Sequence, residues 1–288
     1  MNETRKLRLA LPKGRMNRGV VDLLAEAGIR LTETVRSYRP VVNLPNLAVK
    51  LLKPQNIVEM LHAGSRDVGF AGADWVAELD GELVELLDTG LDPVRVVAAA
   101  PAELLVEGRL PGRELVVASE YERLTRRWIE SQGLTARFVR SYGATEVFPP
   151  EDADLIVDNT ATGATLAANG LTIVGELMRS STRLYAHPAA LEDPVRRAAV
   201  DELVLLLRSV LEARRRVMVE VNVSAGRLEE VLDVLPCMRE PTISRLAGDS
   251  GFAVKAAVPR AELPGVIPRL KAAGGSDVVV TRLAQIVP

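Results

Sequence analysis

The chain has 288 residues, apolar side chains at 48% of its positions and a formal net charge of -2 at pH 7. This length and composition can build two or three hydrophobic cores, so we expect more than one domain. A net charge this close to zero gives no overall field for nucleic acid or for an anionic membrane surface. Functional positive charge must therefore be local, and we expect no nucleic acid and no membrane among the partners.

Cysteine and histidine are scarce, with one of the former and two of the latter. The single Cys237 cannot form an internal disulfide framework, and His62 and His187 provide no cluster with the spacing of a zinc site. Residues 1–8 are rich in charge, and the apolar stretch after them is interrupted at Pro12, so we expect neither a signal peptide nor a membrane span. These features predict a cytoplasmic protein without a protein-held metal site.

Short runs of β-forming residues alternate with helical patterns over the first part of the chain. Strands are predicted at residues 7–11, 48–52, 67–70, 94–99, 115–118, 136–139 and 155–157, and helices at residues 18–27, 55–63, 74–79, 121–132 and 164–168. This alternation predicts βαβ units on a mainly parallel sheet, with ligands bound at the carboxyl ends of the strands. We expect two α/β lobes with a cleft between them.

The pattern changes in the last hundred residues. Residues 188–216 have apolar side chains at near-helical spacing and a basic end that suits a helix C-terminus, so they predict one long amphipathic helix. Beyond it the predicted order is strand 217–223, helix 226–235, strand 253–258, helix 261–273 and strand 278–281. This βαββαβ-like order is typical of a ferredoxin-like module, a common small-molecule sensor fold.

The most informative segment is LIVDNTATGATL at residues 155–166. A hydrophobic strand ends at Asp158, and small hydroxyl and glycine residues then turn into a helix. Backbone amides at the helix start and threonine hydroxyls form a cradle suited to a phosphate, and Gly163 permits close approach of the backbone. Asp158 is placed to accept hydrogen bonds from two ribose hydroxyls. The segment therefore predicts a ribose 5-phosphate site, although an N-capped helix after a buried strand has a similar sequence. The hydroxyls are those of Thr160, Thr162 and Thr165.

The first predicted strand ends in Pro12-Lys13-Gly14-Arg15. Lysine supplies a point charge and arginine a bidentate fork, and two cations around a glycine at the carboxyl end of a strand suit a polyphosphate. Taken alone, a solvated turn explains these residues equally well.

Residues 69–75, GFAGADW, form another strand-to-helix turn rich in small residues. Glycines at such a turn permit either tight packing or the close approach of a ligand. Asp74 can cap the helix that follows. The residues leave both interpretations open.

Five separated segments together resemble the motifs of ATP phosphoribosyltransferases, in the order in which that family has them. The resemblance covers nearly the whole chain, and the joint occurrence of the motifs is far more specific than any one of them. The segments are LALPKGR at 9–15, DVGFAGAD at 67–74, GATEV at 143–147, ADLIVD at 153–158 with TGATLAANGL at 162–171, and EPTI at 240–243 with LAGD at 246–249.

The resemblance implies a fold of the α/β class. It consists of a two-lobed catalytic body similar to periplasmic binding proteins and a C-terminal ferredoxin-like (ACT-like) regulatory domain. The expected boundaries are 1–97 with 180–213 for lobe I, 98–179 for lobe II, which contains the phosphoribosyl pyrophosphate loop, and 214–288 for the regulatory domain. The resemblance also implies a homo-oligomer that shifts between a dimer and a hexamer.

The activity that the resemblance implies is the first step of histidine biosynthesis, with histidine as a feedback inhibitor. N1 of the ATP adenine is joined to C1 of the phosphoribosyl group of phosphoribosyl pyrophosphate, and pyrophosphate is released. Mg²⁺ is expected on the pyrophosphate of the substrate rather than in a protein cage. Negative charge builds on the departing pyrophosphate, so cations are expected to contribute most to the displacement.

The resemblance also assigns residues to roles by their positions in the motifs. The catalytic cations are Arg36, Lys53 and Lys13. The substrate-binding residues are Gly14, Arg15, Asp74, Glu146, Asp158, Thr160, Ala161, Thr162, Gly163, Ala164 and Thr165. The effector-binding residues are Asn222, Glu240 and Thr242.

The chain departs from the family pattern at one wall of the expected site. Many members have Arg-Pro-x-Asp-Ile-Pro where this chain has Lys53-Pro-Gln-Asn56-Ile-Val, and Glu122 stands where a proline often follows the tyrosine. An alternative function is therefore a non-catalytic, nucleotide-binding allosteric regulator of the same fold. The intact loop from Asp158 to Gly163 argues against that alternative. A porphobilinogen-deaminase-like enzyme would need a cysteine in the catalytic body, whereas Cys237 lies in the C-terminal module.

Overall fold

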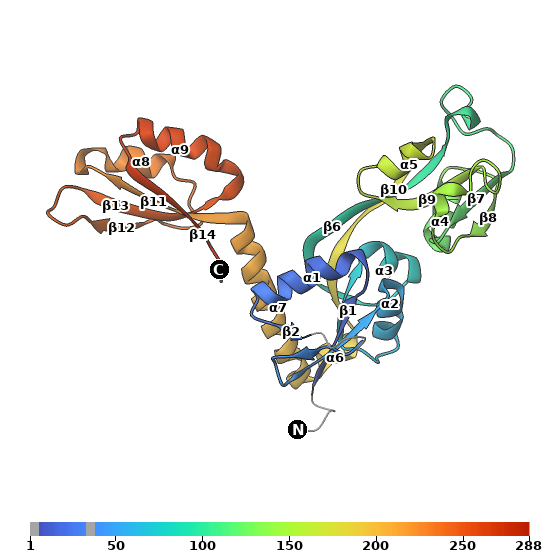
Figure 1. Ribbon diagram of the computed structural model, residues 1–288, viewed down its shortest axis with the longest axis horizontal. Helices are drawn as coiled ribbons and strands as arrows, with labels where there is room; N and C mark the ends of the chain where they lie inside the picture. Colours follow the sequence, from blue (N-terminus) through green and yellow to red (C-terminus); the bar gives the residue numbers. More distant parts are fainter. Residues whose placement is uncertain (1–5, 33–37, 288) are drawn as a thin grey trace. The chain divides into compact units, whose positions relative to one another are not determined.

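The computed structural model describes residues 6–32 and 38–287 and is drawn in Figure 1. The chain is divided into two compact units, which we call the first and the second unit. The first comprises Met1–Ala25 and Ile29–Glu202, and the second comprises Glu26–Gly28 and Leu203–Pro288. The first unit contains an eight-stranded sheet of order β4-β1-β5-β10-β6-β9-β7-β8, and the second contains a four-stranded sheet.

One half of the eight-stranded sheet and its helices form lobe I. Its elements are β1 (Leu7–Pro12), α1 (Arg15–Glu26), β2 (Leu31–Thr32), β3 (Val41–Val42), β4 (Leu47–Leu52), α2 (Pro54–His62), β5 (Val68–Gly72) and α3 (Ala73–Leu79). Strand β1 pairs in parallel with both β4 and β5. On α2, Ile57 and Leu61 are fully buried and pack with Ala10 and Ala71 of the sheet. Each such side chain contributes about 1.5–3 kcal/mol on burial, so this packing holds α2 on the sheet.

The other half forms lobe II. Its elements are β7 (Leu115–Ser119), α4 (Glu122–Ser131), β8 (Ala136–Arg140), the 3-10 helix η3 (Thr145–Val147), β9 (Leu155–Thr160) and α5 (Ala164–Ala168). Strand β7 pairs in parallel with β8 and β9. Tyr121 and Trp128 pack with Leu115, Val117 and Leu155 in one hydrophobic cluster. The predicted βαβ units are therefore present in both lobes.

Two long strands join the lobes; the sequence predicted only residues 94–99 of the first and missed the second. They are β6 (Val84–Pro101), which ends at the 3-10 helix η2 (Ala102–Leu104), and β10 (Leu171–Ala186). Strand β10 is antiparallel to both β5 and β6, and β6 is antiparallel to β9. The prediction of a mainly parallel sheet is corrected to a mixed one, because these two strands cross from one lobe to the other in opposite directions.

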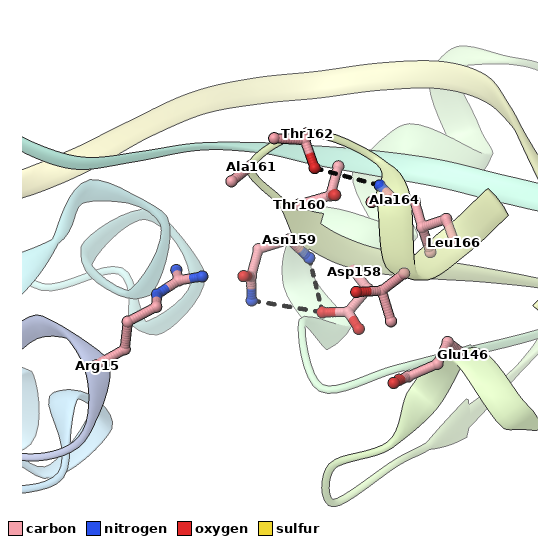
Figure 2. A pocket seen from close by; sticks show the side chains of 10 residues that line it. Arg15, Glu146, Asp158, Asn159, Thr160, Ala161, Thr162, Ala164 and Leu166 are labelled. Atoms are coloured by element: carbon pink, nitrogen blue, oxygen red, sulfur yellow. Dashed lines mark hydrogen bonds between the residues drawn. The ribbon is translucent and has the colours of Figure 1, made fainter. Parts of the chain in front are cut away.

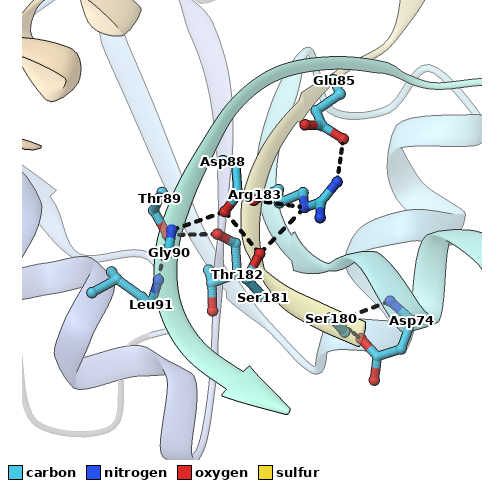
Figure 3. A network of polar contacts seen from close by, with 10 residues as sticks. All are labelled: Asp74, Glu85, Asp88, Thr89, Gly90, Leu91, Ser180, Ser181, Thr182 and Arg183. Carbon is cyan, nitrogen blue, oxygen red and sulfur yellow. Dashed lines mark hydrogen bonds and ion pairs between the residues drawn. The ribbon is translucent and has the colours of Figure 1, made fainter. Parts of the chain in front are cut away.

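The pairing of β6 with β10 is irregular where they leave lobe I, with register shifts on β10 between Ser180 and Thr182 and directly after Thr182. Side chains supply polar partners there (Figure 3). The Thr89 hydroxyl donates to the Thr182 carbonyl at 2.5 Å and accepts from the Leu91 amide at 3.2 Å. Polar contacts therefore take the place of part of the regular ladder at this crossing.

The predicted single helix at residues 188–216 is wrong. The structure has α6 (Pro188–Glu192) and α7 (Pro194–Arg215), separated at Asp193. Asp193 has an extended ψ of 115° because the residue before a proline is disfavoured in a helix. Its carboxylate accepts hydrogen bonds from the amides of Val195 and Arg196, at 2.9 and 3.1 Å, and so caps α7. No helix in the described part of the chain is long and apolar enough to cross a membrane.

The second unit continues from α7 into a βαββαβ module. Its elements are β11 (Arg216–Val223), η4 (Ala225–Arg227), α8 (Leu228–Val234), β12 (Thr242–Arg245), β13 (Phe252–Pro259), η5 (Arg260–Glu262), α9 (Leu263–Ala272) and β14 (Ser276–Arg282). The sheet order is β12-β13-β11-β14, and every neighbouring pair is antiparallel. Alternate valines of β11 pack with Val231 and Leu270 of the helices. The predicted fold class, an α/β body followed by a ferredoxin-like module, is confirmed.

Candidate functional site

A pocket of about 300 Å³ lies where β9 turns into α5. Figure 2 shows its lining from close by. Eight of the residues predicted to bind substrate line it, together with Asn159 and Leu166, which were not predicted. One of the eight is Arg15, which comes from the start of α1 in lobe I, and the other seven come from lobe II. The seven are Glu146, Asp158, Thr160, Ala161, Thr162, Ala164 and Thr165.

Threonines shape the loop between β9 and α5. The Thr160 hydroxyl accepts a hydrogen bond from the Gly163 amide at 2.9 Å, and the Thr162 hydroxyl accepts one from the Ala164 amide at 3.3 Å. Two amides that we expected to face a phosphate are therefore engaged within the loop. Each hydroxyl still has its own hydrogen to donate to an anion.

Gly163 has a φ of +85°, in the left-handed region that glycine adopts without strain. A Cβ atom added there would have Ile173 Cδ1, at 3.8 Å, as its nearest neighbour. The need for glycine at this position is therefore conformational and does not come from crowding.

The Asp158 carboxylate is largely buried beside the pocket. Its pKa is raised to about 6, first by burial and further by the negative charges of Glu146 and Glu120, while a hydrogen bond from the Asn159 amide lowers it. That bond is 2.6 Å long and ends on Asp158 Oδ1. The carboxylate is thus poorly solvated and lies near other negative charges. Hydrogen bonds from hydroxyl groups, or a nearby cation, therefore stabilise its ionised form.

A chain of buried hydrogen bonds links the pocket to α3. The Asn159 amide group donates to the Tyr121 hydroxyl at 2.9 Å, and that hydroxyl donates to Asp74 Oδ2 at 2.7 Å. The Ser180 hydroxyl donates to Asp74 Oδ1 at 2.8 Å. Burial, followed by the Asp74 charge, raises the pKa of Tyr121, so the phenol stays protonated. Trp75 packs on the Tyr121 ring, with 4.7 Å between the ring centroids.

Sequence reasoning did not identify Tyr121, Asn159 or Ser180 as parts of this network. The bonds join residues 38 to 106 positions apart, so no local spacing could have indicated them. Asp74, predicted to bind substrate, is 5% exposed and does not line the pocket. Its carboxylate oxygens are both occupied by hydroxyl donors.

The predicted catalytic cations are not gathered at this pocket. Lys13 Nζ lies 3.2 Å from the centroid of the Tyr38 ring, and the Lys13 amide donates to Leu52 O at 2.8 Å. That bond brings the end of β1 beside the start of α2, where Lys53 is the exposed N-cap residue. Gly14 has a φ of +77°. Arg36 lies outside the described residues.

Asn56 and Glu122 are the other departures from the family pattern. The Asn56 side-chain amide donates to Glu59 Oε2 at 3.0 Å on the exposed surface of α2. Glu122 forms ion pairs with Arg126 and Arg140. Both residues therefore have partners within the chain.

The second unit has its own pocket, of about 250 Å³, between the segment before β12 and the sheet. Glu240 and Thr242, two of the predicted effector residues, line it together with Arg239 and Lys255. Asn222, the third, does not, and its side-chain amide instead donates to Asp277 Oδ2 at 3.2 Å. The pocket thus contains groups of both charge signs.

Comparison with known proteins gives one consistent result. Residues 53–209 match the family model described as ATP phosphoribosyltransferase, and residues 213–285 match the model described as HisG, C-terminal domain. The ATP phosphoribosyltransferase of Pelotomaculum thermopropionicum is 36% identical over 288 residues, covering 98% of this chain and 100% of the relative. That of Desulforudis audaxviator is 37% identical over 290 residues, with coverage of 98% and 100%.

A solved structure is also similar. A chain of the ATP phosphoribosyl transferase (HisG:HisZ) complex from Thermotoga maritima has a TM-score of 0.64 and 28% sequence identity. The match covers 72% of this chain and 98% of that one. This chain is therefore longer than its structural neighbour.

Proposed function

Because the chain belongs to the ATP phosphoribosyltransferase family, we propose that it joins ATP to phosphoribosyl pyrophosphate in the first step of histidine biosynthesis. The observation that most supports this reaction is the pocket at the β9–α5 turn. There Asp158 and the threonine hydroxyls of one loop face the same space. A diol-binding carboxylate beside phosphate donors is the arrangement that a ribose 5-phosphate requires.

The proposed role of each residue follows from the substrate group that it contacts. Asp158 accepts hydrogen bonds from the ribose hydroxyls, which compensates for its burial. Thr160, Thr162 and Thr165 donate to the 5-phosphate. Adenine N1 attacks C1, and the bond from C1 to the pyrophosphate oxygen breaks, so that pyrophosphate leaves. Mg²⁺ bound to the pyrophosphate would offset part of its charge. Cations near the leaving group stabilise the charge that builds on it.

The direct test is to incubate the protein with ATP, phosphoribosyl pyrophosphate and Mg²⁺ and to follow the ultraviolet absorbance change of N1-substituted adenine. We expect product that depends on both substrates, with release of one pyrophosphate for each product formed. Folded protein that binds ATP but forms no product would instead support the non-catalytic regulator.

We propose that Lys53 is one of the cations that stabilise the leaving group. It is exposed at the start of α2, beside the end of β1 where Lys13 lies. Replacing Lys53 by Ala should cost roughly 2–4 kcal/mol of transition-state stabilisation, as for loss of one preorganised donor, and Lys53→Arg should be tolerated. The matched control is Lys271→Ala, which removes an exposed lysine from the second unit. Unaltered turnover and specificity constants in Lys53→Ala would remove this residue from the site.

We propose that free histidine inhibits the enzyme by binding the second unit. Glu240 offers a carboxylate to the ligand's ammonium group, and Arg239 and Lys255 offer cations to its carboxylate. Such inhibition requires different affinities for two states of the enzyme. Glu240→Gln should raise the histidine concentration that halves activity by roughly tenfold, the scale of one charge-assisted contact. The exposed Glu229→Gln serves as control, and equal inhibition of both variants would place the effector elsewhere.

We propose further that the protein works in the cytoplasm as a homo-oligomer that shifts between a dimer and a hexamer. Mass measurements by light scattering, with and without histidine, test this. A single mass under both conditions would contradict the shift.

A further inference from the structure

Another pocket of the first unit, lined by basic side chains, lies near the opposite end of β1 from Lys13 and Arg15. It has a volume of about 180 Å³. Lys6 and Lys13 are seven residues apart, which at roughly 3.3 Å per residue of strand places them about 20 Å apart. We call this hollow the basic pocket. Its cations are Lys6, Arg8, Arg39, Lys50 and Arg66.

The strand register brings these cations together. Arg8 pairs with Ala48, and Ala10 pairs with Lys50, in the parallel ladder of β1 and β4. Residues two apart on a strand, and residues paired across a ladder, point to the same face, so Arg8 and Lys50 lie on one face of the sheet. Arg66 joins them from the loop after α2, which is held to β1 by a 2.9 Å bond from the Asp67 amide to Arg8 O.

A carboxylate next to these cations is already shared. Asp67 is 1% exposed, and it accepts two side-chain hydrogen bonds from Arg8, at 3.0 and 2.6 Å. Arg196 also approaches the same carboxylate, at 3.4 Å. The single negative charge of Asp67 is therefore shared by two guanidinium groups, and it offsets only part of the positive charge of the pocket.

Three of the other cations of the pocket have no ion-pair partner among the described residues. Lys6, Lys50 and Arg66 are half-buried, and none of them forms an ion pair with any residue that the structure describes. Burial, followed by repulsion from Arg8 and Arg39, lowers the pKa of Arg66, and attraction to Asp67 offsets only part of this decrease. Positive groups that are partly withdrawn from water and lie beside one another are unfavourable unless an anion compensates for them.

We propose that the basic pocket is a binding site for a small phosphate-bearing anion, separate from the phosphoribosyl pyrophosphate loop. Guanidinium forks and lysine ammonium groups are the donors that recognise phosphate oxygens. The volume equals that of about six water molecules at about 30 Å³ each, which suits a phosphate or pyrophosphate group but not a whole nucleotide. The inference depends on the geometry of lobe I and not on the proposed reaction.

Titration calorimetry with inorganic pyrophosphate at low ionic strength tests the proposal, since screening weakens such sites at high salt. The wild-type protein should bind two pyrophosphates per chain, one at the substrate site and one in the basic pocket. The double variant Lys50→Ala/Arg66→Ala should lose the second event, with an affinity reduced at least tenfold, the scale of one lost charge-assisted contact. The control Lys271→Ala/Arg282→Ala removes the same charge from exposed positions of the second unit and should retain both events.

The variant Gly163→Val separates this proposal from the proposed function. It alters the loop and should leave the binding event of the basic pocket unchanged. A tungstate soak of wild-type crystals should then show an anomalous peak between Lys50 and Arg66. Identical titrations for the double variant and the wild type would overturn the proposal. So would a change in oligomeric mass in the double variant without a change in pyrophosphate binding, because the cations would then contact a second copy of the chain.

Discussion

Two strand-to-helix turns of the first unit look alike in sequence and differ in structure. The turn from β5 into α3 and the turn from β9 into α5 both follow a buried strand and contain glycine, small residues and an aspartate. At β9–α5 the aspartate and hydroxyls line an open pocket. At β5–α3 the aspartate is 5% exposed and bonded to Tyr121 and Ser180.

The glycines of the two segments are needed for different reasons, Gly69 within β5 and Gly163 at the turn before α5. A Cβ atom added to Gly69 would lie 2.7 Å from Ile57 Cγ2 and 3.2 Å from Ala10 Cβ, so glycine is needed there for the packing of α2. A Cβ atom added to Gly163 would make only an ordinary contact with Ile173 Cδ1, at 3.8 Å, so glycine is needed there for its positive φ. Small residues at a turn therefore indicate either close packing or access for a ligand, and the structure distinguishes them.

The largest expected effect comes from exchanging these two glycines for valine. Gly163→Val should weaken phosphoribosyl pyrophosphate binding about a hundredfold, because a β-branched residue cannot hold this φ and the loop must rearrange. Gly69→Val should leave the loop intact and lower the free energy of unfolding by about 1–3 kcal/mol through overpacking. Calorimetry and urea unfolding measure the two effects. If each variant lost both properties equally, the distinction between the turns would be wrong.

The next effect concerns Asp158 and is pH-dependent. Asp158→Asn should lower kcat/KM for phosphoribosyl pyrophosphate by about tenfold to a hundredfold, through loss of charge-assisted hydrogen bonds. In the wild type kcat/KM should fall as the pH drops below about 6, where the carboxylate becomes protonated.

Asp158→Asn should also stabilise the folded protein at neutral pH. The pKa of Asp158 is higher in the folded protein, about 6, than in an unfolded chain, about 3.9. The folded state therefore binds this proton more tightly, and wild-type stability falls as the pH rises between these values and is then constant. Urea unfolding should show Asp158→Asn to be more stable above about pH 6, with the difference shrinking toward about pH 4. A difference that does not vary with pH would contradict the raised pKa.

The smallest effect on substrate binding is expected from Tyr121→Phe, which tests the closed turn. The ring and its packing against Trp75 remain, but Asp74 Oδ2 and the Asn159 amide lose their shared partner. We expect the free energy of unfolding to fall by about 1–3 kcal/mol, the cost of leaving a buried polar group unsatisfied. Binding of phosphoribosyl pyrophosphate should change by less than about threefold, within the error of additivity. A much larger loss of binding would make Tyr121 part of the substrate site.

Local patterns predicted most of the elements and the phosphate loop, because strand, turn and helix signals there lie within a dozen residues. They failed at β10, where bulges and a change of environment between lobes remove the alternation that marks a strand. The break at Asp193 has a local signal, because the residue before Pro194 is disfavoured in a helix. Contacts such as Tyr121 with Asp74 depend on the docking of α4 on α3, which no single segment encodes.

The position of β10 in the sheet also affects how the chain folds during its synthesis. Strands β5 and β6 each pair on one side with β10, which comes roughly a hundred residues later in the chain. Until β10 has been synthesised, the sheet of lobe I therefore has an unpaired edge at β5. The parallel strands of lobe II can already pair at that stage. Unpaired edges promote association between chains. Ribosome-bound chains that end before Leu171 should accordingly depend more on chaperones than chains that extend beyond Ala186.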